Sequence, residues 1–429
     1  MERVIDVQSS GRPAVFDRAD TDSLFGRTQL VEQPLSQHLL EREEPRFVAW
    51  NKQSGIRAIQ GDSETLAPTG DYRAFLIATD VRVVFVIGDA DGDRTISLPY
   101  EDFVTVEYTA SFRKSTLDIV TVAEKRWQFD CRGDLEPVQS FVDETVQVWT
   151  HALTELDRAE SLAADAKAAV VDDALSTAES KIDAAQEALD SARERVSELG
   201  PGAESTVTDR LEAARRAIAT CRRSRHVGAG DRAHEAAREA WEEQEYERAA
   251  DAYDRARTAY NRAQDVTADQ PPADAIEARR DRVRAEYEQL MSAPVTAAEA
   301  AASAARDATD PAAQAQRWET ALSRYRVAYE LDWARKRRFD GDPASLREAA
   351  ADAAVELVEA NCRAGQMRLD AADAEADASG AAGSKAALMD AKAHFERARE
   401  VATDLVPDRC DPPTDGLTAV AERLVQVEQ

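Results

Sequence analysis

The stretch at residues 72–108 constrains the fold most, because its apolar residues recur with the period of a pleated strand. Every second position from Val81 to Ile87 is Val, Phe or Ile, and residues 104–108 repeat the alternation. Gly and Asp at residues 88–93, and Pro99, supply turns between such segments. We therefore predict four consecutive short strands, at residues 72–79, 81–88, 94–98 and 103–108.

Two short motifs in this stretch resemble a known family. The first, IATDVRVVF at residues 77–85, is an apolar strand that ends in Thr and continues through a turn with Arg; the second is LPYEDF at residues 98–103. Both are similar to signature segments of the bacterial-type pleckstrin-homology (PH) domains of the YokE-like kind, and the similarity extends over residues 35–156. The resemblance implies an α+β unit: an antiparallel β-barrel or sandwich capped by a C-terminal helix. It also implies a binding role, without naming a partner.

The flanking residues complete this arrangement. We predict a short helix at residues 35–40, an irregular strand pair at 46–50 and 55–59, and a last hairpin at 115–122 and 125–131. A capping helix follows, because one helical face carries mostly apolar residues at three- and four-residue steps. These residues are Leu135, Val138, Phe141, Val142, Thr145, Trp149, Ala152, Leu153 and Leu156. The predicted domain is residues 29–157, and residues 1–28 are predicted to be a flexible leader that orders only on contact with something else.

Beyond residue 157 the chain is rich in Ala, Glu, Arg and Asp, which predicts helices. An internal repeat runs through this part, with the form large-x-x-Ala-x-x-x-large-x-x-Ala. Its four copies begin at Leu175, Tyr246, Trp318 and Leu388, which are 71, 72 and 70 residues apart. The two middle copies resemble the second helix of a tetratricopeptide repeat, in which a small Ala lets helices approach. The Gly and the closing Pro of that family are missing at the expected offsets.

Helix breaks follow each copy at a regular distance. Residues 200–202, 270–272, 341–343 and 411–413 each place Pro where a helix can begin but cannot continue. Shorter helices are predicted before the later copies, at residues 231–243, 296–308 and 366–378, so that each unit of about 71 residues holds about three helices. Residues 158–429 are thus predicted to form an all-α repeat region, either a tetratricopeptide-like helical array or a coiled-coil-like elongated bundle.

The charge of the chain limits its partners. The formal charge is -28, from 82 acidic and 54 basic residues, of which only 8 are Lys. This composition is similar to that of haloarchaeal cytosolic proteins; an ordinary acidic protein from a GC-rich genome is the alternative. Either interpretation disfavours nucleic acid, whose phosphates need a basic face. No apolar segment has the length of a signal peptide core or a membrane span, so a cytoplasmic protein is predicted.

Motifs for chemistry are lacking. The loop at residues 89–93 resembles the start of a calcium-binding loop, but Arg94 and Tyr100 stand where that loop requires Gly and Glu. The five His residues are scattered without zinc-ligand spacing. No phosphate-binding, dinucleotide-binding or nucleophile motif occurs. We therefore predict no catalytic, metal-binding or cofactor-binding residues.

Candidate partner-binding residues lie in the helical region. Tyr253, Tyr325 and Phe395 are second large positions of three repeat copies, and the candidates Tyr260, Tyr329 and Trp333 follow them. These aromatic side chains either line a binding face or fill helix–helix interfaces. The other candidates are the basic run Arg335, Lys336, Arg337 and Arg338. This run either neutralises the carbonyl end of a helix or binds an anionic partner helix.

Basic residues are sparse in the N-terminal domain. Residues 32–157 contain 12 basic and 23 acidic residues, which fits lipid headgroup phosphates poorly, so membrane contact is disfavoured. Arg113–Lys114 and Lys125–Arg126 are either one basic group on two adjacent loops or separate solvated turn charges.

The sequence favours a non-enzymatic adaptor or scaffold, in which the PH-like domain and the helical repeat arm both bind protein partners of unknown identity. The alternative is a peripheral membrane-surface sensor that binds lipid through the first domain. A third hypothesis is an enzyme whose motif is not recognisable. The oligomeric state, and the choice between array and bundle, stay open.

Overall fold

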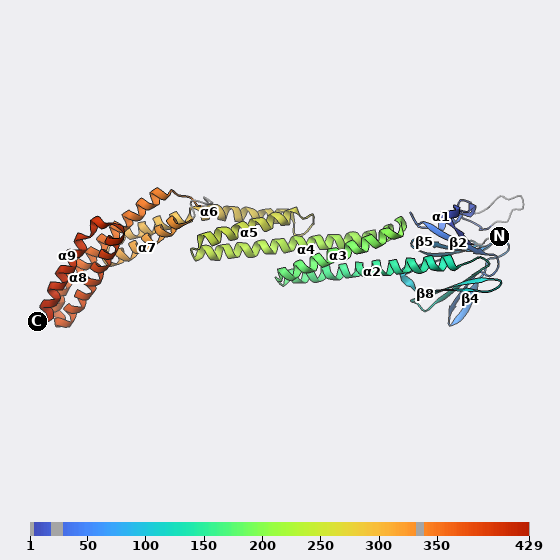
Figure 1. Ribbon diagram of the computed structural model, residues 1–429, viewed down its shortest axis with the longest axis horizontal. Helices are drawn as coiled ribbons and strands as arrows, with labels where there is room; N and C mark the ends of the chain where they lie inside the picture. The colour runs from blue at the N-terminus through green and yellow to red at the C-terminus, as the bar shows by residue number, and fades with distance from the viewer. Residues whose placement is uncertain (1–3, 19–28, 332–338, 429) are drawn as a thin grey trace. The chain divides into compact units, whose positions relative to one another are not determined.

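The computed structural model describes residues 4–18, 29–331 and 339–428 (Figure 1). The chain divides into two compact units. The first comprises Met1–Arg225 and Val266–Pro271, and the second comprises His226–Asp265 and Pro272–Gln429. An N-terminal part built on two antiparallel sheets is followed by an all-helical region.

The first unit contains two five-stranded sheets in which every paired neighbour is antiparallel. One sheet has the order β1 (Val4–Asp6), β2 (Pro45–Asn51), β5 (Ala74–Thr79), β6 (Arg82–Ile87) and β7 (Arg94–Pro99). The other has the order β4 (Asp62–Leu66), β3 (Ile56–Gln60), β10 (Arg126–Cys131), β9 (Ser115–Thr121) and β8 (Phe103–Ala110). All eight predicted strands are present, but the predicted pairing of residues 46–50 with 55–59 is wrong, because β2 pairs with β5 and β3 pairs with β10 in the other sheet. The strand β4 was not predicted, because its largely exposed sequence DSETL has no apolar alternation.

The helix α2 (Glu136–Val171) closes the core between the sheets (Figure 1). Phe85 of one sheet stacks on Phe129 of the other, with ring centroids 6.0 Å apart, and Trp149 of α2 is buried in the same core. The predicted capping helix is therefore confirmed. However, α2 continues without a break past residue 157, and its buried face continues to Ala166. The domain boundary predicted at residue 157 thus falls inside a continuous helix and a continuous core.

The prediction of a flexible leader is wrong for residues 4–18. The strand β1 pairs with β2, with Ile5 opposite Val48, and is followed by α1 (Val7–Ser10) and the 3-10 helix η1 (Ala14–Phe16). Phe16 is buried against the outer face of the first sheet, together with Leu35 of η2 (Leu35–His38). This outer face is apolar and needs a cover. The few apolar residues of the leader form part of this cover. They show no helix or strand periodicity, so the sequence did not predict it.

Four helices begin at or beside the Pro breaks that the sequence predicts. After α3 (Leu175–Leu199), the helix α4 (Pro201–Glu242) starts at the first predicted break, and α6 (Ala273–Arg306), α8 (Pro343–Leu405) and α9 (Asp411–Glu428) start at or beside the other three. The helices α5 (Tyr246–Asp265) and α7 (Pro311–Glu330) lie between them. The 3-10 helices η3 (Tyr100–Asp102) and η4 (Pro407–Arg409) are short connections.

The internal repeat is a packing repeat. Its positions are buried in every copy, and the copies begin α3 and α5 and lie within α7 and α8. The buried positions are Leu175, Ala178, Ile182, Ala185, Tyr246, Ala249, Tyr253, Ala256, Trp318, Ala321, Tyr325, Ala328, Leu388, Ala391, Phe395 and Ala398. The three-helix unit is wrong: residues 231–242, 296–306 and 366–378 are the ends or interiors of α4, α6 and α8. These stretches are Ala-rich, and the preceding helices run through them although Gly230, Pro294 and Gly365 lie at or just before their starts.

The range of α8 contains a helical hairpin of its own. Asn361 Oδ1 lies 3.0 Å from His394 Nδ1, and Arg368 pairs with Asp390 at 4.0 Å. Thirty-three residues of straight helix would separate the first pair by about 50 Å. The chain must therefore reverse between Arg368 and Asp390, so each period of about 71 residues holds two helices, with the repeat copy on the second.

Candidate functional site

Tyr260, a predicted partner-binding residue, is fully buried. Its hydroxyl donates a hydrogen bond to Asp231 Oδ1 at 2.6 Å, and its ring packs against Gly230, where a Cβ would lie 2.5 Å from the ring. Tyr253, Tyr325 and Phe395 are buried as well. The partner-binding assignment of Tyr260 is therefore corrected. These aromatic residues fill helix–helix interfaces, because Ala-rich helices need bulky side chains to pack against each other.

Tyr329, at the end of α7, is a surface residue. Its side chain is 37% exposed, and Arg347 of α8 donates a hydrogen bond to its hydroxyl at 2.6 Å. The Arg347 guanidinium also lies 5.5 Å from the ring centroid, a cation–π distance. The remaining candidates, Trp333, Arg335, Lys336, Arg337 and Arg338, lie outside the described residues.

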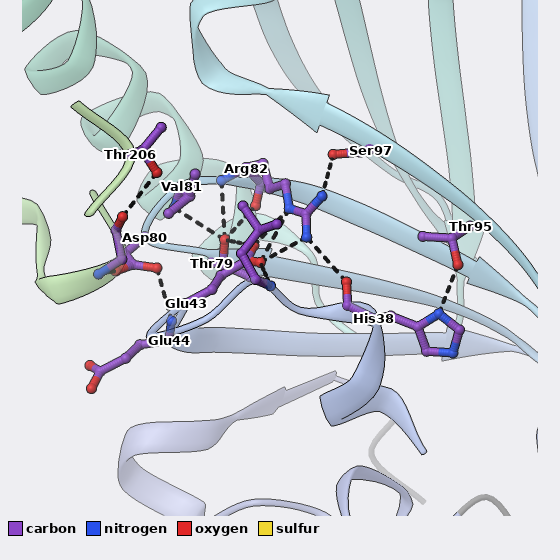
Figure 2. Close-up of polar contacts among 12 residues, drawn as sticks. His38, Glu43, Glu44, Thr79, Asp80, Val81, Arg82, Thr95, Ser97 and Thr206 are labelled. Atoms are coloured by element: carbon purple, nitrogen blue, oxygen red, sulfur yellow. Dashed lines mark hydrogen bonds and ion pairs between the residues drawn. The ribbon is translucent and has the colours of Figure 1, made fainter. Parts of the chain in front are cut away.

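The motif at residues 77–85 forms a buried polar cluster instead of a surface site. Figure 2 shows Arg82 facing Glu43: Nε and Nη2 donate to the two carboxylate oxygens at 2.9 and 2.8 Å. The Glu43 side chain is fully buried, so its charge needs this bidentate partner. The Thr79 hydroxyl lies 2.8 Å from Glu43 Oε1 and accepts hydrogen bonds from the Val81 and Arg82 amides at 3.1 Å. The cluster fixes the turn between β5 and β6.

Asp80 connects this turn to the helices. Its Oδ1 accepts from the Glu44 amide and its Oδ2 from the Gly202 amide, both at 2.9 Å. Its carbonyl accepts from Trp149 Nε1 of α2 at 3.0 Å. Gly202 lies in the first turn of α4, where a carboxylate satisfies a free amide and favours the positive end of the helix dipole. A Cβ at Gly202 would lie 2.6 Å from Asp80 Oδ2, so only Gly permits this approach.

Burial sets the electrostatics of this cluster. Desolvation raises the pKa of Asp80 above its ordinary value, and the amide hydrogen bonds from Glu44 and Gly202 oppose that rise. The buried Tyr100 hydroxyl donates to the Thr79 carbonyl at 2.7 Å. Its pKa is raised by desolvation and by the nearby charges of Asp80 and Glu43. These groups are engaged with one another, so the arrangement is suited to holding β5, α2 and α4 together.

The two sequence motifs identified only part of this cluster. Thr79, Asp80, Arg82 and Tyr100 belong to the two motifs, but their partners Glu43 and Gly202 lie elsewhere in the chain. The Gly-Pro-Gly at residues 200–202 was predicted as a helix break. Its second Gly was also the available signal of a close approach by another part of the chain.

A second polar cluster ties three helices of the second unit together. Glu286 of α6 accepts from His234 Nε2 at 2.7 Å and Arg238 Nε at 2.9 Å, both on α4, and from the Tyr253 hydroxyl of α5 at 3.1 Å. The hydrogen bond from Arg238, aided by that from His234, lowers the pKa of Glu286 to about 2. Burial raises the pKa of Tyr253. An adjacent hollow of about 510 Å³ is lined by Arg238, Trp241, Glu242, Tyr253, Glu286 and Gln289. Sequence analysis missed this cluster, because its members lie 33 to 52 residues from Glu286 and acidic residues occur throughout the chain.

Among residues 4–18, 29–331 and 339–428, no three His, Cys, Asp or Glu side chains are placed to hold one metal ion. None of the helices in the same part of the chain combines the length and the apolar character that crossing a bilayer requires. No protein family model, curated protein or solved structure matches this chain.

Proposed function

We propose that the protein is a non-enzymatic adaptor, in which a PH-like sheet domain and a helical repeat arm each bind a protein partner. The observation that carries this proposal is the burial of the repeat positions in all four copies. Because the repeat positions pack neighbouring helices together, the repeats form packed helical hairpins. Stacks of such hairpins present extended outer surfaces, which repeat proteins use for binding.

The sheet domain supports a PH-like fold. Two antiparallel sheets enclose one core, and a long amphipathic helix enters that core with Trp149 and Leu156. Within the YokE-like signature, the Asp80 carbonyl accepts the hydrogen bond from Trp149 of this helix, and the Tyr100 hydroxyl donates to the neighbouring Thr79 carbonyl. The resemblance thus rests on residues with a structural role in this chain, which favours a shared fold over chance similarity.

The helical arm supports a binding role through its outer surface. Helices adjacent in the chain pack against each other from α5 to α9. Several large apolar side chains stay exposed on these helices: Val327, Tyr329, Met367 and Met389. Exposed aromatic and Met side chains are enriched at protein interfaces. Tyr329 with its Arg347 partner is therefore the best described position from which to test the arm.

A pull-down with the full-length chain tests this proposal. The variant Tyr329→Ser/Arg347→Ser removes the exposed pair, and Val171→Ser removes another exposed apolar side chain at the end of α2 as a matched control. We expect a protein from the native cytosol in near-stoichiometric amount with the wild type and the control, and less with the double variant, when all melt alike. The arm proposal fails if the wild type retains nothing above empty resin, or if the double variant retains as much as the wild type.

A further inference from the structure

A cationic hollow lies on the first unit where three loops meet. It has a volume of about 520 Å³ and is lined by residues 51–54, by Arg113 and Lys114, and by residues 130–132. Four basic side chains, Lys52, Arg113, Lys114 and Arg132, line it, against the single acid Asp130. The basic group expected from Arg113–Lys114 and Lys125–Arg126 does not line it as a set: Lys125 stacks on Trp127 and Arg126 pairs with Asp118.

Two of the four cations are not neutralised by ion pairs. Lys114 pairs with Asp130 at 2.8 Å, and Lys52 pairs with Asp71 at 3.4 Å. Arg113 and Arg132 are exposed and, among the described residues, form no ion pair. The hollow is therefore a local positive patch on a chain with a net charge of -28.

The loops around the hollow are held by hydrogen bonds. Asn51 Nδ2 donates to the Gly55 carbonyl at 2.9 Å, and its Oδ1 accepts from the Gly55 amide at 2.8 Å. The Ser111 amide and hydroxyl both donate to the Lys114 carbonyl, at 2.8 and 2.7 Å. This turn presents Phe112, whose side chain is 100% exposed, beside Arg113. A fully exposed aromatic residue next to Arg side chains has the composition of an interface centre.

We propose that this cationic hollow and Phe112 bind a short acidic segment of a partner protein. Carboxylates of the segment meet Arg113 and Arg132, which are suited to bidentate recognition, and an apolar side chain of the segment packs on Phe112. The inference rests on the proposed adaptor function and names the partner chemistry of its first unit.

Charge favours a peptide over an anionic bilayer as the occupant. A bilayer is a plane, and its charge would also face acidic residues elsewhere on this domain, since residues 32–157 carry 23 acidic and 12 basic residues. A short segment contacts only the hollow. At physiological ionic strength the Debye length is about 8 Å, so a charge bound in the hollow is screened from more distant carboxylates.

Fluorescence anisotropy with the full-length protein tests the proposal. The probe is the labelled peptide EDLEFDE, with QNLQFNQ as the uncharged control and EDSESDE as the control without apolar side chains. The variant Arg113→Ala/Arg132→Ala removes both cations, and Arg215→Ala/Arg216→Ala removes two exposed arginines from α4 as a charge-matched control. All titrations use the lowest KCl concentration at which every variant keeps the wild-type circular dichroism.

We expect the wild type to bind EDLEFDE about tenfold or more tightly than QNLQFNQ, and Arg113→Ala/Arg132→Ala to lose about tenfold while the matched control loses little. Phe112→Ser should weaken EDLEFDE binding but leave EDSESDE binding unchanged. Equal binding of charged and uncharged peptides, or equal losses in both Arg variants, overturns the proposal. So does sedimentation with phosphatidylglycerol vesicles without peptide binding, which indicates a lipid surface instead. Because the pull-down above perturbs the arm alone, the two proposals can fail separately.

Discussion

Replacing Asp80 with Ala is expected to loosen the start of α4. The change removes a buried carboxylate that accepts from the Glu44 and Gly202 amides at 2.9 Å each. A hydrogen bond to a charged group contributes about 1.5–3 kcal/mol, and loss of a helix cap costs about 0.5–2 kcal/mol. Desolvation of the carboxylate, which also raises the pKa of Asp80, offsets part of this gain. We therefore expect a net loss of about 2 kcal/mol at the first turn of α4.

Hydrogen exchange measures this loss where it occurs. A local destabilisation of about 2 kcal/mol speeds exchange of the amides of that turn about 30-fold, at about 1.4 kcal/mol per factor of ten. Asp209→Ala, which removes an exposed carboxylate of the same helix, should leave exchange unchanged. Gly202→Ala should act like Asp80→Ala, because its Cβ would lie 2.6 Å from Asp80 Oδ2. If Asp80→Ala and Asp209→Ala exchange at the wild-type rate, Asp80 does not hold α4.

Three further predictions concern the second unit and the charge. Tyr260→Ala should destabilise the protein by about 3–5 kcal/mol and Tyr329→Ala by less than about 1 kcal/mol, since only the first leaves a cavity; equal losses in urea denaturation contradict this. The pKa of Glu286 is about 2 in the folded protein, against an ordinary value of 4.5. This difference implies stabilisation that is present above pH 4.5 and lost as the pH falls toward 2. The difference in Tm between the wild type and Glu286→Gln should therefore shrink over that range, and a constant difference refutes it. Finally, Tm should rise from dilute buffer to 1 M KCl, because a Debye length of about 3 Å screens the repulsion among excess carboxylates; a flat or falling curve counts against the halophile interpretation.

Local patterns predicted the elements well. The period-two alternation at residues 81–87 gave β6, and Pro at residues 343 and 412 marked the starts of α8 and α9. Helices continued where the sequence predicted a gap, even past Gly230, Pro294 and Gly365. Tertiary packing, and not a single Gly or Pro, decides there whether the chain turns. The segments that cover the outer sheet face were missed because their apolar residues, such as Phe16 and Leu30, form no periodic pattern. They are buried against a sheet face whose position is defined only in the folded chain.

The candidate site was less predictable than the fold. Aromatic residues at repeat positions have the same sequence signature whether they pack or bind, and Tyr260 turned out to pack. The cationic hollow depends on Lys52, Arg113 and Arg132 meeting from three loops. Their sequence separation hides this grouping. Only the register of β3, β9 and β10, fixed by long-range pairing, brings these loops to the same end of the sheet.

The contacts of Asp80 also bear on where the first unit can be cut. A fragment that ends near residue 157 keeps the Glu44 amide as a partner but lacks Gly202, so the buried carboxylate loses one of its two amide donors. Such a cut also removes residues 158–171 of α2 and exposes the rest of a core that α2 shares with Val196 of α3 and with Val207 and Leu211 of α4. Exposing a continuous apolar face costs about 25 cal/mol for each Å². We therefore expect limited proteolysis to leave a stable N-terminal fragment that extends past Cys221. A stable fragment of about 130 residues that keeps the wild-type circular dichroism of its sheets would show instead that the sheet domain folds without α3 and α4.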